Sequence, residues 1–340
     1  MIYLSPESCH EEPQHEHVYT EEIDEKKGVR IITANGIPTH KTGKFPNQGN
    51  PNTILPQNAR YEILLHPKPA ETPISAQGIR MGILFSGVEL DPFTGEFFEG
   101  KNNTNRAWNI TTLTSSVDLG LDCNNGHVQP TGKYHYHGTP NAYLDEMNVD
   151  GTEMIKVGYA ADGYPIYYKW GYDTSGAITA LESGYRLKEG ERSGDGISAP
   201  DGAYDGTYFQ DYEYVSGTSE LDACNGRYGK TPDSDNEYYY VITDNFPSSP
   251  ICFQAEPSDD FRNGRMDGAQ AGPRHGRGAP PQRGQGGRPN PQEMMTSMDT
   301  NGDGKLEKSE VHGPLQNEFE RADKNKDGFL TLEELSPRQR

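Results

Sequence analysis

The sequence predicts a mainly β body, a sandwich or barrel-like fold rich in loops, followed by a small α-helical pair near the C-terminus. Only 32% of the 340 residues are hydrophobic, yet the chain holds 39 glycines, 25 prolines and 20 tyrosines, which is typical of short strands and turns around an aromatic core. Runs of β-branched and aromatic residues alternate with Gly, Asn and Pro turn signals. A parallel α/β fold would need crossover helices between these runs, and the sequence shows no pattern for them.

Composition sets the expected domain limits. Residues 1–28 are acidic and polar, and we expect a flexible N-terminal segment there. The β body is expected to occupy residues 29–256. Residues 257–292 are rich in Gly, Pro and Arg and have almost no aliphatic side chains, which predicts a flexible linker. Residues 293–336 then form a separate C-terminal module. The clearest strand candidates in the body are 29–33, 61–65, 80–85 and 238–243.

The charge and hydropathy of the chain exclude several classes of partner. A net charge of −20 and a pI near 4.9 argue against binding to nucleic acid or to anionic lipid. No run approaches the roughly 20 apolar residues of a transmembrane helix. Residues 1–9 lack a basic start followed by an apolar run, so we expect no signal peptide in this stretch.

The C-terminal module contains two loops with oxygen side chains at positions 1, 3 and 5, glycine at 6 and glutamate at 12. Ca²⁺ prefers roughly six to eight oxygen ligands, and this spacing supplies them from one tight turn and a bidentate glutamate. Both loops resemble those of the EF-hand family, so two Ca²⁺ sites are expected. Leu306 and Leu330 should pair as a short bridge between the loops. The expected ligands are Asp299, Asn301, Asp303, Lys305, Glu307 and Glu310 in the first loop, and Asp323, Asn325, Asp327, Phe329, Thr331 and Glu334 in the second, with Lys305 and Phe329 acting through their carbonyl oxygens.

A second candidate metal motif lies in the body, in the run Tyr134-His135-Tyr136-His137. Side chains alternate between the two faces of a strand, so the two histidines share one face and the two tyrosines the other. Imidazoles at i and i+2 can converge on a zinc or copper ion, and His127 is the candidate third ligand. The alternative interpretation is a group of histidines that stabilises the β core or contacts a ligand.

On these residues the body resembles the YHYH-domain family, and the resemblance extends over about residues 29–256. It implies a domain without established catalytic residues. It also implies an exported bacterial protein, hence an extracellular or periplasmic location, which suits calcium sites. Further segments that resemble the family are Asn35–His40, Leu121–His127, Ala161–Ile166, Tyr204–Tyr208 and Leu221–Gly226.

The body also shows a weak internal repeat. Leu121–His127 and the histidine run after it are echoed by Leu221–Arg227 and the run 238–243. In the echo, Arg227, Tyr239 and Val241 take the places of the three histidines. A metal site in the first copy would therefore be absent from the second, and the duplication itself is a hypothesis.

The four cysteines allow three pairings, and the sequence does not choose among them. Cys224 and Cys252 bracket the strand of the second repeat, so we expect them to form a disulfide that closes a loop of about 29 residues. Cys9 and Cys123 either pair with each other or remain free. Reduced, buried thiols are the alternative for all four.

Three classes of function follow. The first is an exported calcium-binding protein whose body recognises a glycan or protein partner through its tyrosines. The second is a metalloenzyme in which His127, His135 and His137 hold a transition metal while Asp162 or His40 serves the chemistry. The third is a structural surface or matrix protein. Composition favours the first and third, because the sequence contains no nucleophile elbow or phosphate-binding loop.

Overall fold

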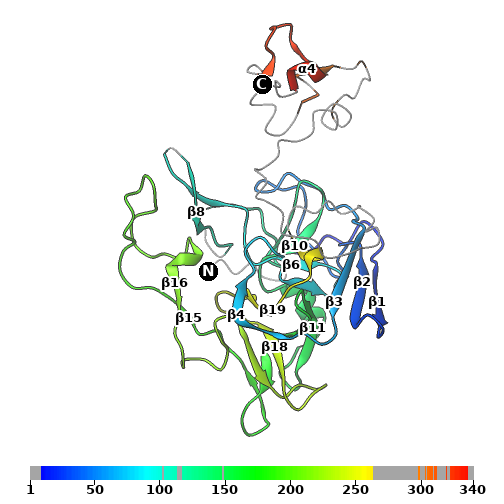
Figure 1. Ribbon diagram of the computed structural model, residues 1–340, viewed down its shortest axis with the longest axis vertical. Helices are drawn as coiled ribbons and strands as arrows, with labels where there is room; N and C mark the ends of the chain where they lie inside the picture. The colour runs from blue at the N-terminus through cyan, green and yellow to red at the C-terminus, as the bar shows by residue number, and fades with distance from the viewer. Residues whose placement is uncertain are drawn as a thin grey trace. The chain divides into compact units, whose positions relative to one another are not determined.

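The computed structural model describes residues 9–101, 103–112, 117–147 and 149–262 of the body. In the C-terminal region it describes residues 298, 303, 305–308, 310, 311, 319 and 322–335. The chain divides near residue 270 into two compact units, and each is treated by itself (Figure 1).

One eight-stranded mixed sheet forms the centre of the body. Its strands are β5 (Gly82–Leu84), β6 (Glu89–Leu90), β9 (Gly126–Val128), β10 (Tyr134–Tyr136), β11 (Ile155–Ala160), β12 (Pro165–Tyr168), β17 (Gly226–Gly229) and β18 (Glu237–Ile242). They lie in the order β17-β18-β12-β11-β5-β6-β10-β9. The mainly β prediction is confirmed, with a sheet that curls like half a barrel and stays open.

From either edge of the sheet to its centre, the strand pairs follow the same sequence of antiparallel and parallel pairing. The pairs β9–β10 and β17–β18 are antiparallel, β10–β6 and β18–β12 are parallel, and β6–β5 and β12–β11 are antiparallel again. At the centre β5 and β11 run antiparallel. Two reciprocal hydrogen bonds flank them, from Phe85 N–H to Val157 O at 2.9 Å and from Ala161 N–H to Met81 O at 2.8 Å. We call β5, β6, β9 and β10 the first half and β11, β12, β17 and β18 the second half. The repeat expected from the sequence comprises β9–β10 and β17–β18, which take equivalent places at the two edges of this order.

The N-terminal part of the body forms a three-stranded sheet. This sheet corrects the expectation of a flexible segment at residues 1–28 for the described residues of that range. Strand β1 (Tyr19–Asp24) pairs with β2 (Val29–Ala34), which pairs with β3 (Ala59–Leu64). Residues 9–28 are therefore ordered along the body rather than a flexible segment. The acidic side chains of β1 are accommodated because they face solvent, and Glu21 forms an ion pair with Arg30 on β2.

The other end of the body also extends further than expected. Strand β4 (Pro69–Ser75) pairs with β19 (Cys252–Ala255), and a 3₁₀ turn η3 (Asp259–Phe261) follows. Phe261 is fully buried and stacks on Tyr61, with ring centroids 4.5 Å apart. Burial of this aromatic ring fixes the chain as far as Arg262, so residues 257–262 belong to the body and not to the linker.

Short elements complete the body around the large sheet. The first helix, α1 (Asn141–Glu146), follows β10 and buries Ala142, Tyr143 and Leu144. Three further two-stranded ribbons, with strands of three to six residues, and one more 3₁₀ turn lie in the described part of the body. Among them are β7 (Phe97–Glu99) with β8 (Thr104–Asn109), β13 (Trp170–Tyr172) with β14 (Ile178–Ala180), β15 (Tyr185–Leu187) with β16 (Tyr212–Tyr214), and η2 (Phe209–Asp211).

Two disulfides cross-link the body. Cys224 is bonded to Cys252, the pairing expected from the sequence, and Cys9 is bonded to Cys123. Such bonds persist in oxidising compartments and indicate an extracellular-type environment. Among the residues that the structure describes, none of the helices has the length and hydrophobicity needed to cross a bilayer.

The C-terminal unit contains the expected bridge between its loops. Strand β20 (Leu306–Glu307) pairs with β21 (Phe329–Leu330), with Leu306 opposite Leu330. Both leucines are buried with Val311 and Phe319. A short helix, α4 (Leu332–Leu335), follows the second strand. The rest of the expected helical pair lies outside the described residues.

Candidate metal centre

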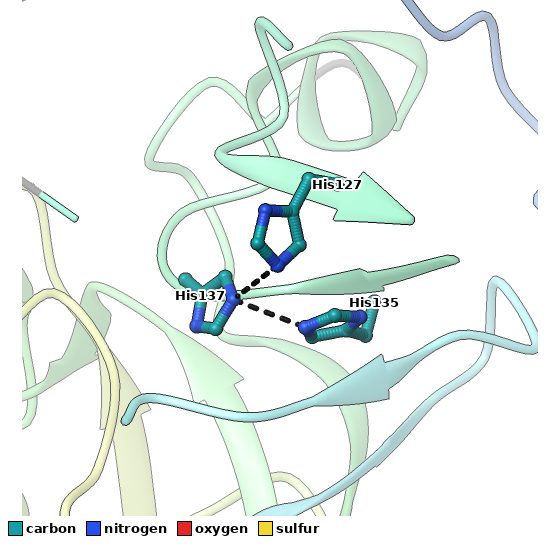
Figure 2. A group of neighbouring side chains, drawn as sticks. All are labelled: His127, His135 and His137. Atoms are coloured by element: carbon teal, nitrogen blue, oxygen red, sulfur yellow. Dashed lines mark hydrogen bonds between the residues drawn. The ribbon is translucent and has the colours of Figure 1, made fainter. Parts of the chain in front are cut away.

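Three histidines converge at one edge of the large sheet (Figure 2). His127 lies on the edge strand β9 and is the cross-strand partner of His135 on β10. His137 comes two residues later and points to the same face, because strand side chains alternate. The tyrosines between them, Tyr134 and Tyr136, point to the opposite face and are fully buried in the core. The alternation expected from the sequence is thus present.

The spacing of the three ring nitrogens suits one metal ion. The Nε2 atom of His137 lies 3.0 Å from Nε2 of His135 and 3.1 Å from Nε2 of His127 (Figure 2). Nitrogens bound to one ion at about 2.0–2.1 Å are separated from one another by roughly 2.9–3.4 Å. All the candidate ligand atoms lie within 4.8 Å of one another, so rotation of the rings would bring the three onto a shared ion.

Groups around the histidines fix which nitrogen faces the centre. His127 donates from Nδ1 to the carbonyl of Leu119 at 2.9 Å, which leaves the lone pair on Nε2. The backbone carbonyls of Lys133 and Asp91 interact with His135 and His137 and raise their pKa slightly, although neither Nδ1 atom has a hydrogen-bond partner of standard geometry. This arrangement favours protons on Nδ1 and lone pairs on Nε2, as in metal-binding histidines.

The two inner histidines are held uncharged. Burial is the main cause that lowers the pKa of His135 well below its ordinary value, and the neighbouring His137 and His127 lower it further. The pKa of His137 is lowered in the same way, first by burial and then by His127. Neutral imidazole is the form that binds metal ions, so the environment keeps the ligands ready at neutral pH.

The histidines face an open cleft of about 810 Å³. An ion held by three protein nitrogens on the cleft wall would keep a coordination position free, as catalytic zinc sites do and structural ones do not. Amide, aromatic and charged side chains make up the rest of the wall. They include Asn50, Asn52, Gln77, Asp91, Phe93, Thr94, Glu96, Phe97, Arg106 and Gln129.

A buried charge network lies beside His135. Glu89 on β6 is the cross-strand neighbour of His135 and is almost fully buried. Its carboxylate accepts hydrogen bonds from Tyr61 Oη at 2.6 Å and from Lys133 Nζ at 3.3 Å, and it lies 2.7 Å from Arg80 Nε. Two cations therefore surround this one carboxylate, and Glu89 is a structural anchor for the strand.

Asp91, two residues further along, is a site residue that the sequence analysis missed. Its side chain is 4% exposed, it lines the cleft, and its Oδ1 atom has no hydrogen-bond partner. Burial raises the pKa of Asp91 to about 7, and the charge of Arg80 partly opposes this rise. The available signal was the alternation Glu89-Leu-Asp91, but it has meaning only once β6 is known to pair with β10.

The other residues considered for the metalloenzyme lie elsewhere. His40 is buried and forms a hydrogen bond through Nε2 with Tyr136 Oη at 2.5 Å, on the face opposite His135. Asp162 belongs to the second half and accepts hydrogen bonds from Tyr240 Oη at 2.6 Å and from the backbone of Ala255 at 3.1 Å. Neither side chain lines the cleft, so both have structural positions.

The second half carries a different set of residues on the equivalent face. Arg227 pairs with Tyr239 where His127 pairs with His135, and Tyr167 lies opposite Val241 where Asp91 adjoins His137. Pro165 takes the place of Glu89. Tyr167, Tyr239 and Val241 belong to a small hydrophobic core against which the β13–β14 ribbon packs. That core contains Met154, Tyr167, Leu181, Leu221, Tyr239 and Val241, with Tyr172 and Ile178 packed against it.

The calcium loops are described in part. In the second loop the carboxylate of Asp323 accepts hydrogen bonds from the backbone of Asp327 and Gly328, and Glu334 reaches back to the backbone of Thr331 at 3.0 Å. The loop is thus closed around its oxygen atoms. Asp303, Lys305, Glu307, Glu310, Asn325 and Phe329 are also described, whereas Asp299 and Asn301 lie outside the described residues.

Comparison with known proteins agrees with this division of the chain. A family model described as YHYH protein matches residues 60–255, and a model of the EF hand matches residues 292–312 and 315–336. No curated protein and no solved structure matches the chain. The EF-hand motifs are those of calcium-binding loops, and the matched family has no assigned activity.

Proposed function

The chain belongs to the YHYH protein family, and we propose that its body is a transition-metal centre at His127, His135 and His137 that acts on a ligand in the adjoining cleft. The observation that carries this proposal is the convergence of three Nε2 atoms, with those of His127 and His135 within 3.1 Å of that of His137. When the protons are on Nδ1, three Nε2 lone pairs face one another and repel. A bound cation converts that repulsion into three bonds, and this supports the metal over a purely structural cluster.

The character of the site supports chemistry rather than simple storage. Three nitrogen ligands and one open side allow a bound ion to polarise a ligand oxygen as a Lewis acid. Imidazole ligands suit zinc, copper and related ions. The cleft offers amides from Asn52 and Gln129 and the rings of Phe93 and Phe97, a combination that suits a neutral polar ligand such as a glycan.

We further propose that the C-terminal module binds two Ca²⁺ ions in an exported protein. The matched EF-hand motifs and the two disulfides support this pairing of calcium with an oxidising compartment. There are two competing functions. One is the binding of calcium and a partner without any transition metal, and the other is a structural role in a matrix. Neither would require uncharged histidines to face an open cleft.

The test of the metal centre is a titration of the full-length protein, purified without an affinity tag and stripped of metal. With excess Ca²⁺ present, zinc, cobalt and copper are each added and the bound ion is measured. We expect about one equivalent bound, and a loss of at least about a hundredfold in affinity in His135→Ala/His137→Ala. His15→Ala/His66→Ala removes two exposed histidines and is the matched control. Absence of a bound transition metal in the wild type would refute the proposal.

The calcium module has a separate test. Ca²⁺ at about a hundredfold excess over Kd should stabilise the module by about 2.7 kcal/mol. Glu310→Gln/Glu334→Gln should remove this shift in a calorimetric scan. Both tryptophans, Trp108 and Trp170, lie in the body, so their fluorescence melting curve should not respond. A calcium-dependent shift that persists in the double variant would contradict the assignment of these ligands.

A further inference from the structure

We propose that Asp91 is the outer-sphere carboxylate of the metal centre, accepting a hydrogen bond from a water molecule on the open side of the bound ion. Such a carboxylate would orient that water and stabilise its protons by hydrogen bonding. This inference rests on the proposed metal centre and adds a positioning residue to it.

The position of Asp91 is the first support. It follows β6, and its backbone N–H donates to the carbonyl of Tyr136 at 2.7 Å, which fixes it beside His137. The three histidine nitrogens and an acidic oxygen of Asp91 do not form one close ligand set, because the cluster of possible ligand atoms contains the histidines alone. Asp91 is therefore placed beyond the first ligands of the ion while it still lines the same cleft.

The unsatisfied oxygen is the second support. Oδ1 of Asp91 is buried and has no hydrogen-bond partner, an arrangement that is unfavourable for a polar oxygen and most of all for a charged one. The nearby Arg80 and Lys133 pair with Glu89, and their charges offset the burial of Asp91 only in part. A water molecule held by the ion would supply the missing donor, and the ion itself would favour the charged carboxylate.

The second half shows that the fold does not need an acid here. Tyr167 occupies the equivalent position, facing Val241 in place of His137, and is fully buried in the small hydrophobic core. The same backbone is therefore stable with an aromatic side chain. An acid and three histidines occur together in the first half and are replaced together in the second, as expected for members of one site.

Cobalt supplies a readout that does not depend on a known substrate. Full-length, tag-free protein is loaded with Co²⁺ in excess Ca²⁺, and its visible spectrum is followed from pH 5 to 9 to find the midpoint at which the bound water ionises. A carboxylate that accepts from this water stabilises its protonated form. We therefore expect Asp91→Asn to lower the midpoint by about one pH unit and to weaken Co²⁺ binding about ten- to hundredfold.

Controls separate this contact from general electrostatics. The charged groups near the centre are Glu89, Arg80 and Lys133 in the buried network and Glu96 and Arg106 on the cleft wall. Glu96→Gln removes the other carboxylate of the cleft and should leave the midpoint and the affinity within twofold of the wild type.

The outcomes are distinct. An unchanged midpoint and affinity in Asp91→Asn would overturn the proposal, and so would an equal shift in Glu96→Gln. If Asp91→Asn does not fold, Asp91→Ser, which also lacks the charge, is measured by the same criteria. Failure of the wild type to bind Co²⁺ would instead refute the metal centre itself, so the two proposals fail in different ways.

Discussion

The two halves of the large sheet share one backbone pattern and differ in what their outer faces carry. In the first half that face presents His127, His135 and His137 to a cleft, whereas in the second half it is an apolar core covered by a ribbon. The comparison teaches that the strand pairing does not depend on the histidines. Because the scaffold is stable without them, their presence in one half is best explained by a ligand.

The opposite face is shared by both halves. Tyr134 in the first half donates from Oη to the buried Asp122 at 2.7 Å, and Tyr238 in the second half donates to the half-buried Asp222 at 2.9 Å. A β-carbon at Gly126 would lie 2.7 Å from the Tyr134 hydroxyl, and one at Gly226 would lie 2.1 Å from that of Tyr238, so both positions require glycine. The common features are therefore those that build the sheet.

The largest expected effects on stability come from the disulfides of the two halves. The bond from Cys9 to Cys123 spans 114 residues and that from Cys224 to Cys252 spans 28. The chain-entropy model assigns them about 5 and about 3.5 kcal/mol of stability. We expect Cys9→Ser/Cys123→Ser to lower the urea midpoint more than Cys224→Ser/Cys252→Ser, as followed by tryptophan fluorescence. The reverse order would show that local packing around each bond outweighs loop length.

The shared aspartates should also differ in importance. Asp122 is almost fully buried and accepts from Tyr134 and from the backbone of Gly43 at 3.0 Å, while the more accessible Asp222 accepts from Tyr238. We expect Asp122→Ala to lower the free energy of unfolding by about 4 kcal/mol and Asp222→Ala by about 2 kcal/mol. The cost is smaller for Asp222→Ala because it leaves fewer buried polar groups without partners. Denaturant titrations of both variants measure this, and equal costs would mean that the two clamps are equivalent.

A third pair of effects depends on pH and has opposite signs in the two halves. Burial lowers the pKa of His40, the partner of Tyr136, to about 4, whereas burial raises the pKa of Asp162, the partner of Tyr240, to about 6. From pH 6.5 down to 4 the unfolded chain binds a proton at His40 that the folded chain refuses, so stability falls by about 3 kcal/mol. From pH 3.8 up to 6 the folded chain retains a proton on Asp162, so its contribution falls as pH rises.

Two conservative variants isolate these terms. The stability difference between the wild type and His40→Gln should increase with pH, and that between the wild type and Asp162→Asn should decrease with pH. Urea titrations at pH 4, 5, 6 and 7 measure both. If the two stability differences changed with pH in the same direction, the equivalent tyrosines would have the same kind of partner. The proposed contrast between the two halves would then be wrong.

Local patterns in the sequence were sufficient for much of this structure. Alternation placed His135 and His137 on one face, loop spacing marked the calcium module, and the bracketing of a strand indicated Cys224 with Cys252. These features depend on residues close together in the chain.

What remained hidden depends on distant pairings. Asp91 joins the site only because β6 runs parallel to β10, and residues 19–24 are ordered only because β1 pairs with β2. An acidic segment without an apolar stripe gives no local sign that an edge strand will form from it. The cleft is likewise assembled from loops that are far apart in sequence.

The compactness of the histidine hairpin has a kinetic consequence. His127 and His137 are only ten residues apart, whereas β10 reaches its parallel neighbour across more than four times that separation, as between Glu89 and Lys133, which are 44 residues apart. A loop of about ten residues closes in roughly 10–100 ns, long before a large β topology is complete. In the proposed metal centre, the hairpin would therefore capture an ion while most of the chain is still unfolded, and the metal present in the compartment of folding would decide which ion the mature protein contains.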